Sequence, residues 1–162
     1  MCAVIATPVF LGLVLPTSLF GSASRDHVWH APAAGVRIVD GETLGFGDRV
    51  VRLAGINAPA RGVSCHSARG DAFDCGAAAA AALARLVAGR DMSCRIVGND
   101  DFGRGLGECD AAGTAVNSAM VREGFALSRG TDLDAEEHAA RREARGLWAH
   151  GAGSPPGWRT RD

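Results

Sequence analysis

The sequence contains no lysine and no tyrosine, and its charges nearly cancel. All 17 basic residues are arginines, whose planar guanidinium suits bidentate contacts with phosphate better than a lysine ammonium does. The formal net charge of −1 excludes an overall positive field that would attract nucleic acid. Any binding of a polyanion must therefore depend on a local cluster of arginines.

The chain also lacks a Cys-x-x-Cys pair, and its histidines are scattered, which disfavours the alternative of a zinc site. Besides Cys2, it has four cysteines: Cys65, Cys75, Cys94 and Cys109. An even number of cysteines in an exported chain favours disulfides. Of the three possible pairings, the spacing favours the two local ones, Cys65–Cys75 and Cys94–Cys109.

The N-terminal segment is apolar and uncharged from Ala3 to Phe20, and small residues follow at 21–24. This pattern predicts a signal peptide over residues 1–23 and a periplasmic or secreted protein. No basic residue precedes the apolar run, and Pro8 and Pro16 interrupt it. An uncleaved N-terminal anchor in the inner membrane therefore stays open as the alternative.

The remaining chain has the length of one domain, which we expect over residues 34–150, with an irregular tail at 151–162. A loose stretch at 25–34 precedes three short strand-like runs separated by glycine-containing turns, at 36–39, 43–46 and 50–54. A loop at 60–75 leads to an alanine-rich helix at 76–88. A hairpin of strands at 92–97 and 105–109 follows, and then two helices, the first ending at Gly124 and the second at 134–145. This order predicts an α+β fold, a five-stranded OB-fold barrel with about three α-helices.

Five phrases, in this order and spacing, resemble the staphylococcal nuclease-like (thermonuclease) family. They are DGETL at 40–44, VRLAGINAP at 51–59, DDFGRG at 100–105, VNSAMVREGFA at 116–126 and ARGLW at 144–148. The resemblance covers about residues 36–150, and the four cysteines resemble those of exported bacterial members. It implies an OB-fold enzyme that hydrolyses phosphodiester bonds of DNA and RNA with a calcium ion.

The resemblance assigns Arg52 and Arg104 as the catalytic arginines that hold the phosphate. The chemistry agrees, because phosphodiester cleavage builds negative charge on the phosphate oxygens and guanidiniums stabilise it. Phe102 stands where the family has a tyrosine, and it keeps the ability to stack on a base. Phe102 is therefore an expected substrate contact. Thr43, in the first family phrase, is the other expected substrate contact.

The family's metal ligands map to Glu42, Asn57 and the backbone carbonyl of Ala58, with Asp40 as a nearby carboxylate. Glu42 is one methylene longer than the family's aspartate. Asn57 replaces an aspartate and loses its negative charge. Because calcium affinity follows the charge and geometry of the ligands, we expect a weakened calcium site or none.

Alanine occupies position 60, where the family has the glutamate that is the candidate general base. Loss of a positioned base costs a factor of about 10²–10⁴ in rate. A carboxylate from the loop at 61–74, Asp71 or Asp74, is an alternative source of a base. The resemblance therefore implies a nuclease with a degenerate site and weak or absent activity.

A non-catalytic OB-fold module is the competing hypothesis. It would bind nucleic acid or another phosphate ligand through Arg52 and Arg104 without cutting it. In either case the expected partner is DNA or RNA, single-stranded and weakly bound, because the net charge is near zero. Nothing in the sequence requires a protein partner, and we expect a monomer.

Overall fold

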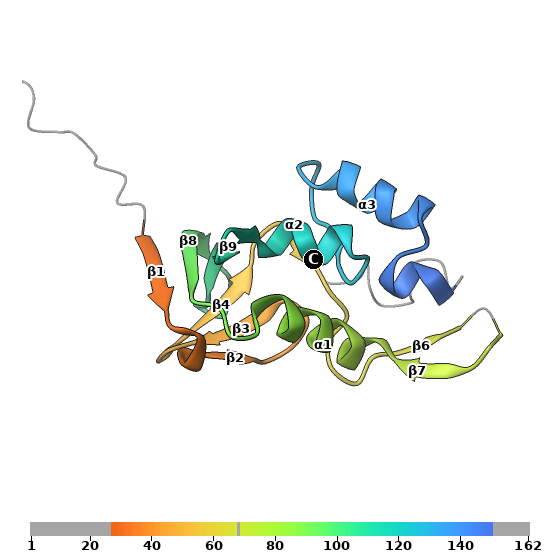
Figure 1. Ribbon diagram of the computed structural model, residues 1–162, viewed down its shortest axis with the longest axis horizontal. Helices are drawn as coiled ribbons and strands as arrows, with labels where there is room; N and C mark the ends of the chain where they lie inside the picture. Colours follow the sequence, from red (N-terminus) through yellow and green to blue (C-terminus); the bar gives the residue numbers. More distant parts are fainter. Residues whose placement is uncertain (1–26, 68, 151–162) are drawn as a thin grey trace, which may run out of the picture.

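The computed structural model describes residues 27–67 and 69–150, which form a curled β-sheet with helices packed against it (Figure 1). The main sheet contains β1 (His27–Ala31), β2 (Val36–Ile38), β3 (Thr43–Phe46), β4 (Arg49–Leu53), β8 (Met92–Asn99), β9 (Gly105–Ala111) and β10 (Thr114–Ala115). Two small sheets are formed by β5 (Ile56–Asn57) with β11 (Leu127–Ser128), and by β6 (Ser64–His66) with β7 (Ala72–Asp74). The α-helices are α1 (Cys75–Val87), α2 (Val116–Arg122) and α3 (Asp134–Arg142), and the 3-10 helices are η2 (Ala33–Gly35) and η3 (Gly146–His150).

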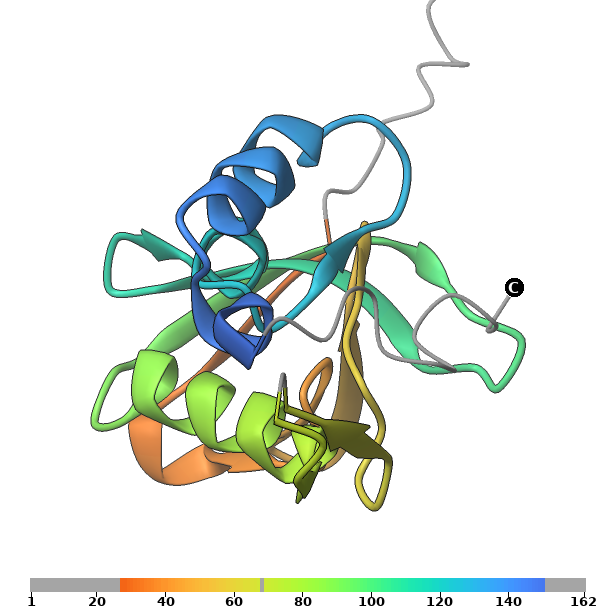
Figure 2. The ribbon, with the colours of Figure 1, turned by 90° about the vertical axis from the view of Figure 1, so that its right-hand side faces the viewer.

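The two edge strands of the main sheet are neighbours in the sequence. The strand order is β1-β8-β9-β4-β3-β2, with β4 and β9 parallel and the other neighbours on this path antiparallel. Only the turn η2 joins β1 to β2, where the Gly35 N–H donates to the Pro32 carbonyl at 2.7 Å. The sheet therefore curls so that its ends come together (Figure 2). This confirms the predicted α+β fold of the OB type with three α-helices.

Two stretches differ from the prediction. Residues 25–34, predicted to be loose, contain β1, so the sheet extends beyond the predicted domain start at residue 34 to His27. Residues 60–75, predicted as a loop, contain the β6–β7 hairpin, which projects past α1 (Figure 1). These strands are short and most of their residues are exposed. Backbone pairing holds them, together with apolar contacts of Trp29, Cys65 and Phe73. Such short runs contain too few apolar residues to predict a strand by alternation.

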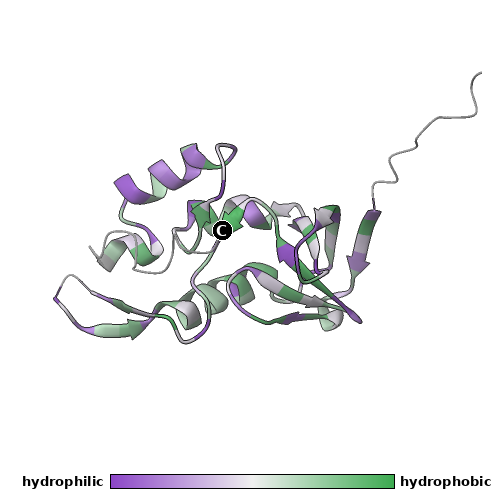
Figure 3. Cartoon of the chain, turned by 180° about the vertical axis from the view of Figure 1, so that it is seen from behind, coloured by the Kyte–Doolittle hydropathy of each residue, from purple (hydrophilic) through white to green (hydrophobic). Residues whose placement is uncertain are grey.

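The core lies between the inner face of the sheet and the helices. Its largest fully buried side chains include Leu44, Leu53, Leu83 and Met120. Helix α2 contacts both α1 and α3 (Figure 1). Helix α3 is largely hydrophilic, and only Ala140 of its residues is buried (Figure 3). Helix α3 therefore adds little apolar packing to the barrel.

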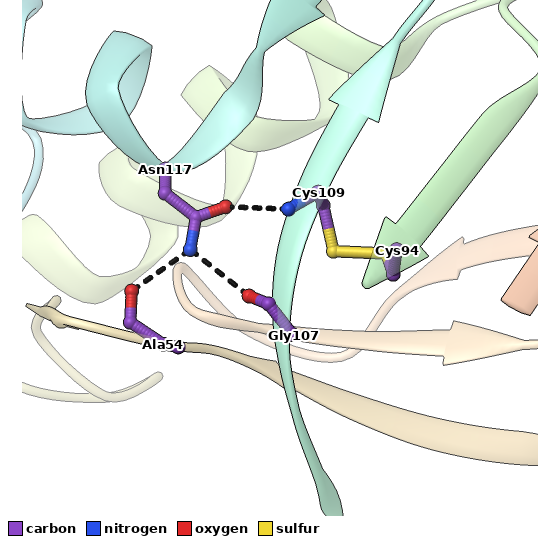
Figure 4. Close-up of a disulfide and its surroundings, with 5 residues drawn as sticks. All are labelled: Ala54, Cys94, Gly107, Cys109 and Asn117. Carbon is purple, nitrogen blue, oxygen red and sulfur yellow. Dashed lines mark hydrogen bonds between the residues drawn. A yellow bond between two sulfur atoms is a disulfide. The ribbon is translucent and has the colours of Figure 1, made fainter. Parts of the chain in front are cut away.

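Asn117 connects α2 to the barrel through three hydrogen bonds (Figure 4). Its Nδ2 donates to the carbonyls of Ala54 at 2.8 Å and Gly107 at 3.0 Å, and its Oδ1 accepts from the Cys109 N–H at 3.0 Å. Ala54 follows β4, whereas Gly107 and Cys109 lie in β9. A single buried amide therefore fixes the end of β4 and the middle of β9 relative to the helix.

Both predicted disulfides are present. Cys65–Cys75 joins β6 to the first residue of α1, and Cys94–Cys109 joins β8 to β9 at a directly opposed pair of residues. The predicted leader at 1–23 and tail at 151–162 lie outside the described residues. Within residues 27–67 and 69–150, no helix is long and apolar enough to cross a membrane.

Candidate functional site

An open cleft of about 800 Å³ lies where β4 and β5, the β8–β9 turn and the residue after β11 meet. Its charged lining residues are Asp40, Glu42, Arg52, Asp100, Asp101, Arg104 and Arg129. The structure thus places both predicted phosphate-binding arginines in one cleft. Four acidic residues face three arginines there, so the lining has no excess of positive charge.

Arg52 is held by a buried carboxylate. The side chain of Glu42 is 8% exposed and that of Arg52 is 13% exposed. Glu42 Oε1 forms an ion pair with Arg52 Nη2 at 2.9 Å, and it accepts a hydrogen bond from Arg52 Nε at 3.1 Å. The other oxygen, Oε2, accepts the Ala58 N–H at 2.9 Å. Burial raises the pKa of Glu42, and it outweighs the Ala58 hydrogen bond and the Arg52 charge, which lower it.

Arg104 is held by a carboxylate in the β8–β9 turn. Asp100 Oδ2 accepts a hydrogen bond from Arg104 Nε at 2.6 Å, while Oδ1 accepts the N–H groups of Phe102 and Arg104 at 3.0 and 2.9 Å. Gly103 takes the positive φ of 75° that this tight turn requires. Desolvation acts to raise the pKa of Asp100, but the hydrogen bonds from Arg104 and Phe102 and the Arg104 charge together hold it below its usual value.

Each arginine keeps part of its hydrogen-bonding capacity. A guanidinium has five N–H donors. Glu42 takes two donors of Arg52, and Asp100 takes one side-chain donor of Arg104. The carboxylates therefore orient the guanidiniums and leave N–H groups for an anion in the cleft.

Phe102 lies beside Arg104 at the mouth of the same cleft. Its side chain is 84% exposed, far more than any other large hydrophobic residue in the described part of the chain. The Arg104 guanidinium carbon lies 5.3 Å from the ring centroid. A phosphate ligand and an aromatic stacking surface are the two elements of a groove for single-stranded nucleic acid.

Comparison with known proteins agrees with this geometry. The family model described as staphylococcal nuclease homologue matches residues 50–150. The chain belongs to this family. Among curated proteins, the succinoglycan biosynthesis protein ExoI of Rhizobium meliloti (strain 1021) is similar, with 32% identity over 117 residues, which is 68% of this chain. The match spans 61% of that relative's length. Membership supports a nuclease-type fold and nucleic-acid binding in general.

The calcium site that the family resemblance implies can be compared with the side chains at the corresponding positions. Both oxygens of Glu42 are engaged, by Arg52 and by the Ala58 N–H. Asp40 Oδ1 accepts the Glu42 N–H at 2.9 Å, and Asn57 contributes an amide in place of a carboxylate. Among the residues described, no group of three His, Cys, Asp or Glu side chains is arranged to hold a metal. Calcium takes six to eight oxygen ligands, and of the side chains at these positions only Asp40 and Glu42 carry a negative charge.

Thr43 is not brought to the cleft. It lies in β3 opposite Arg52 and is 1% exposed, and it is not among the cleft-lining residues. In the part of the chain described, its Oγ1 is buried without a hydrogen-bond partner. The structure therefore gives Thr43 a position in the core, whereas the sequence assigned it to substrate binding.

Neither candidate replacement base reaches the cleft. Asp74 Oδ1 accepts the Ala77 N–H at 2.7 Å and caps α1, and Asp71 bonds the Ser67 hydroxyl in the β6–β7 hairpin. Ala60 packs with its backbone against α1, where a Cβ on Gly76 would lie 1.8 Å from the Ala60 carbonyl oxygen. The start of α1 therefore holds the segment that carries Ala60, and its side chain offers no base.

Sequence reasoning missed Arg129. This exposed residue follows β11, and its N–H donates to the Gly55 carbonyl at 2.8 Å. The pairing of β11 with β5 brings it to the cleft from more than 70 residues away in sequence. Arg129 belongs to none of the family phrases, so no local signal identified it.

Proposed function

We propose that this domain binds a phosphate-bearing ligand, foremost single-stranded nucleic acid, in the Arg52–Arg104 cleft and hydrolyses it weakly or not at all. The observation that carries the proposal is the meeting of two carboxylate-oriented guanidiniums and the exposed Phe102 ring in one cleft. The arginines would hold a phosphate, and the ring would stack on an adjacent base.

The binding we propose is weak and sensitive to salt. Four carboxylates line the cleft beside three arginines, and the net charge of the chain is −1. Phosphate contacts release counterions, so the affinity falls as the salt concentration rises. Stacking on Phe102 has no such dependence and accepts any base. We therefore expect a site with little sequence preference.

The same residues argue against efficient cleavage. Ala60 cannot accept a proton from water, and a missing base costs a factor of about 10²–10⁴ in rate. Glu42, the best candidate for a metal ligand, already neutralises Arg52 and accepts the Ala58 N–H. The site retains the groups that bind a phosphate, and it has lost the glutamate at position 60 that the family offers as the base.

The proposed location is the periplasm or the exterior of the cell. The two disulfides suit an oxidising compartment. The apolar segment at 1–23 is the proposed export signal. We propose a monomer as the working form.

The test is binding of a fluorescently labelled single-stranded oligonucleotide to the full chain, measured by anisotropy at low salt. We expect binding that weakens about ten-fold or more in Arg104→Gln and in Arg52→Gln, since each loses charge-assisted hydrogen bonds. Arg142→Gln, on the exposed face of α3, is the charge-matched control. A sugar phosphate is the second probe, because the relative is named for succinoglycan biosynthesis. Wild type that binds neither probe would overturn the proposal.

A further inference from the structure

Arg129 differs from the other two arginines of the cleft. Arg52 is paired with Glu42 and Arg104 with Asp100. In the part of the chain that the structure describes, the Arg129 side chain takes part in no ion pair. Arg129 is exposed and lines the cleft. It therefore contributes a guanidinium that forms no ion pair with a carboxylate of the described residues, in a cleft that Asp40 and Asp101 also line.

The backbone at Arg129 is fixed from two sides. The Arg129 N–H donates to the Gly55 carbonyl at 2.8 Å, immediately after the β5–β11 pairing of Ser128 with Ile56. The Ser128 N–H donates at 2.7 Å to Glu137 of α3. Arg129 thus stands at an ordered position of the backbone, and it lines the cleft together with residues of the β8–β9 turn that carries Arg104.

The cleft is larger than one phosphate needs. Its volume of about 800 Å³ lies in the range of pockets that bury a drug-sized ligand. Arg52 and Arg104 already supply donors for one phosphate. A third guanidinium, on another element and in no ion pair among the described residues, suits a second anionic group of the same ligand.

We propose that Arg129 forms a second phosphate subsite, so that the cleft selects a strand with at least two consecutive phosphates over a single phosphomonoester. This inference rests on the proposed function. Arg52 and Arg104 hold one phosphate, Phe102 stacks on a base, and Arg129 holds the neighbouring phosphate. Arg129 acts as a specificity-determining residue, because a mononucleotide leaves its subsite empty.

The test compares two probes on the full chain: a single-stranded oligothymidylate and thymidine monophosphate. For Arg129→Gln we expect oligothymidylate affinity to fall about ten-fold, while the affinity for the monophosphate changes by less than about two-fold. The slope of log affinity against log salt should also become shallower by about 0.7, the value for one phosphate contact on a single strand. Arg142→Gln removes the same charge from the exposed face of α3 and should change neither affinity.

Two results would overturn this inference while leaving the proposed function intact. In the first, Arg129→Gln binds oligothymidylate like wild type. In the second, Arg129→Gln loses affinity for both probes equally, which would place Arg129 on the same phosphate as Arg52 and Arg104. Wild type that binds neither probe would instead overturn the proposed function, and this inference with it.

Discussion

The two acid–arginine pairs of the cleft contain the same kinds of groups, but the pKa of the carboxyl group is raised in one pair and lowered in the other. Glu42 and Arg52 lie on the barrel wall and are almost fully buried, and burial raises the pKa of Glu42. Asp100 and Arg104 are four residues apart in one turn, and the Arg104 guanidinium there is 30% exposed. Desolvation of Asp100 is outweighed by hydrogen bonds from Arg104 and Phe102, which hold its pKa low.

The difference shows what each pair contributes. A buried pair gains little net stability, because desolvation of two charges offsets their attraction, but removal of one partner is costly. In the turn pair the arginine is 30% exposed, so solvent weakens the attraction more, and Asp100 also accepts two backbone N–H groups of the turn. We infer that the Glu42 pair fixes Arg52 rigidly and that the Asp100 pair shapes the turn that presents Arg104 and Phe102.

The largest effect should come from Glu42→Ala. It leaves the Arg52 guanidinium without its carboxylate and the Ala58 N–H without an acceptor, so the free energy of unfolding should fall by about 3–5 kcal/mol. Urea denaturation measures this change. Asp100→Ala is the matched variant in the turn pair, whose arginine is 30% exposed against 13% for Arg52, and it should cost less. Equal losses would contradict the distinction between the two pairs.

Asn117→Ala should have the next largest effect on stability, because it weakens the barrel beside the strand that carries Arg52. It removes the acceptor of the buried Cys109 N–H and a donor to the Ala54 carbonyl, next to the strand that carries Arg52. Unsatisfied buried groups cost about 1–3 kcal/mol each, so we expect a loss of about 2–4 kcal/mol. The neighbouring Ser118→Ala is the control, since its hydroxyl bonds Glu136 at the long distance of 3.3 Å. A loss below that of Ser118→Ala would show that Asn117 is not needed to hold the strands.

The pH dependence of stability should have opposite signs at the two acids. The contribution of Glu42, whose pKa is raised above the usual 4.5, is fully present below pH 4.5 and is lost as the pH rises through the folded pKa. The contribution of Asp100, whose pKa lies below the usual 3.8, is present above pH 3.8 and is lost as the pH falls through the folded pKa. The free energy of unfolding should be measured from pH 2 to 7. Glu42→Gln should reduce the loss of stability as the pH rises above 4.5, and Asp100→Asn should reduce the loss of stability as the pH falls below 3.8. Slopes of the same sign would refute the assignment.

Much of the fold follows from local signals in the sequence. The turns, the apolar runs and the helix-ending glycines predict the three-stranded meander, the β8–β9 hairpin and the helices, and Gly89 and Gly124 adopt positive φ where α1 and α2 end. Strand β1 and the β6–β7 hairpin carry no such signal, because they depend on pairing with another strand and leave most side chains exposed.

The site could be predicted only in part. The family phrases identified Arg52 and Arg104, which the structure brings into one cleft. They could not reveal that Glu42 and Asp100 would pair with these arginines, because both pairs depend on side-chain geometry. Arg129 arrives through the long-range pairing of β11 with β5, and no motif marks it. Thr43 lies inside a family phrase, yet it is buried and is not among the residues that line the cleft.

The most direct test of binding without efficient cleavage is a hydrolysis assay on single-stranded DNA with the full chain, in calcium and in chelator. Wild type, Arg52→Gln and Ala60→Glu are compared at protein concentrations at which wild type binds the DNA. We predict that wild type cuts the bound DNA weakly or not at all in both conditions. A gain of cleavage in Ala60→Glu would identify the missing base as the main defect. Efficient calcium-dependent cleavage by wild type that is lost in Arg52→Gln would contradict binding without efficient cleavage and show a working nuclease.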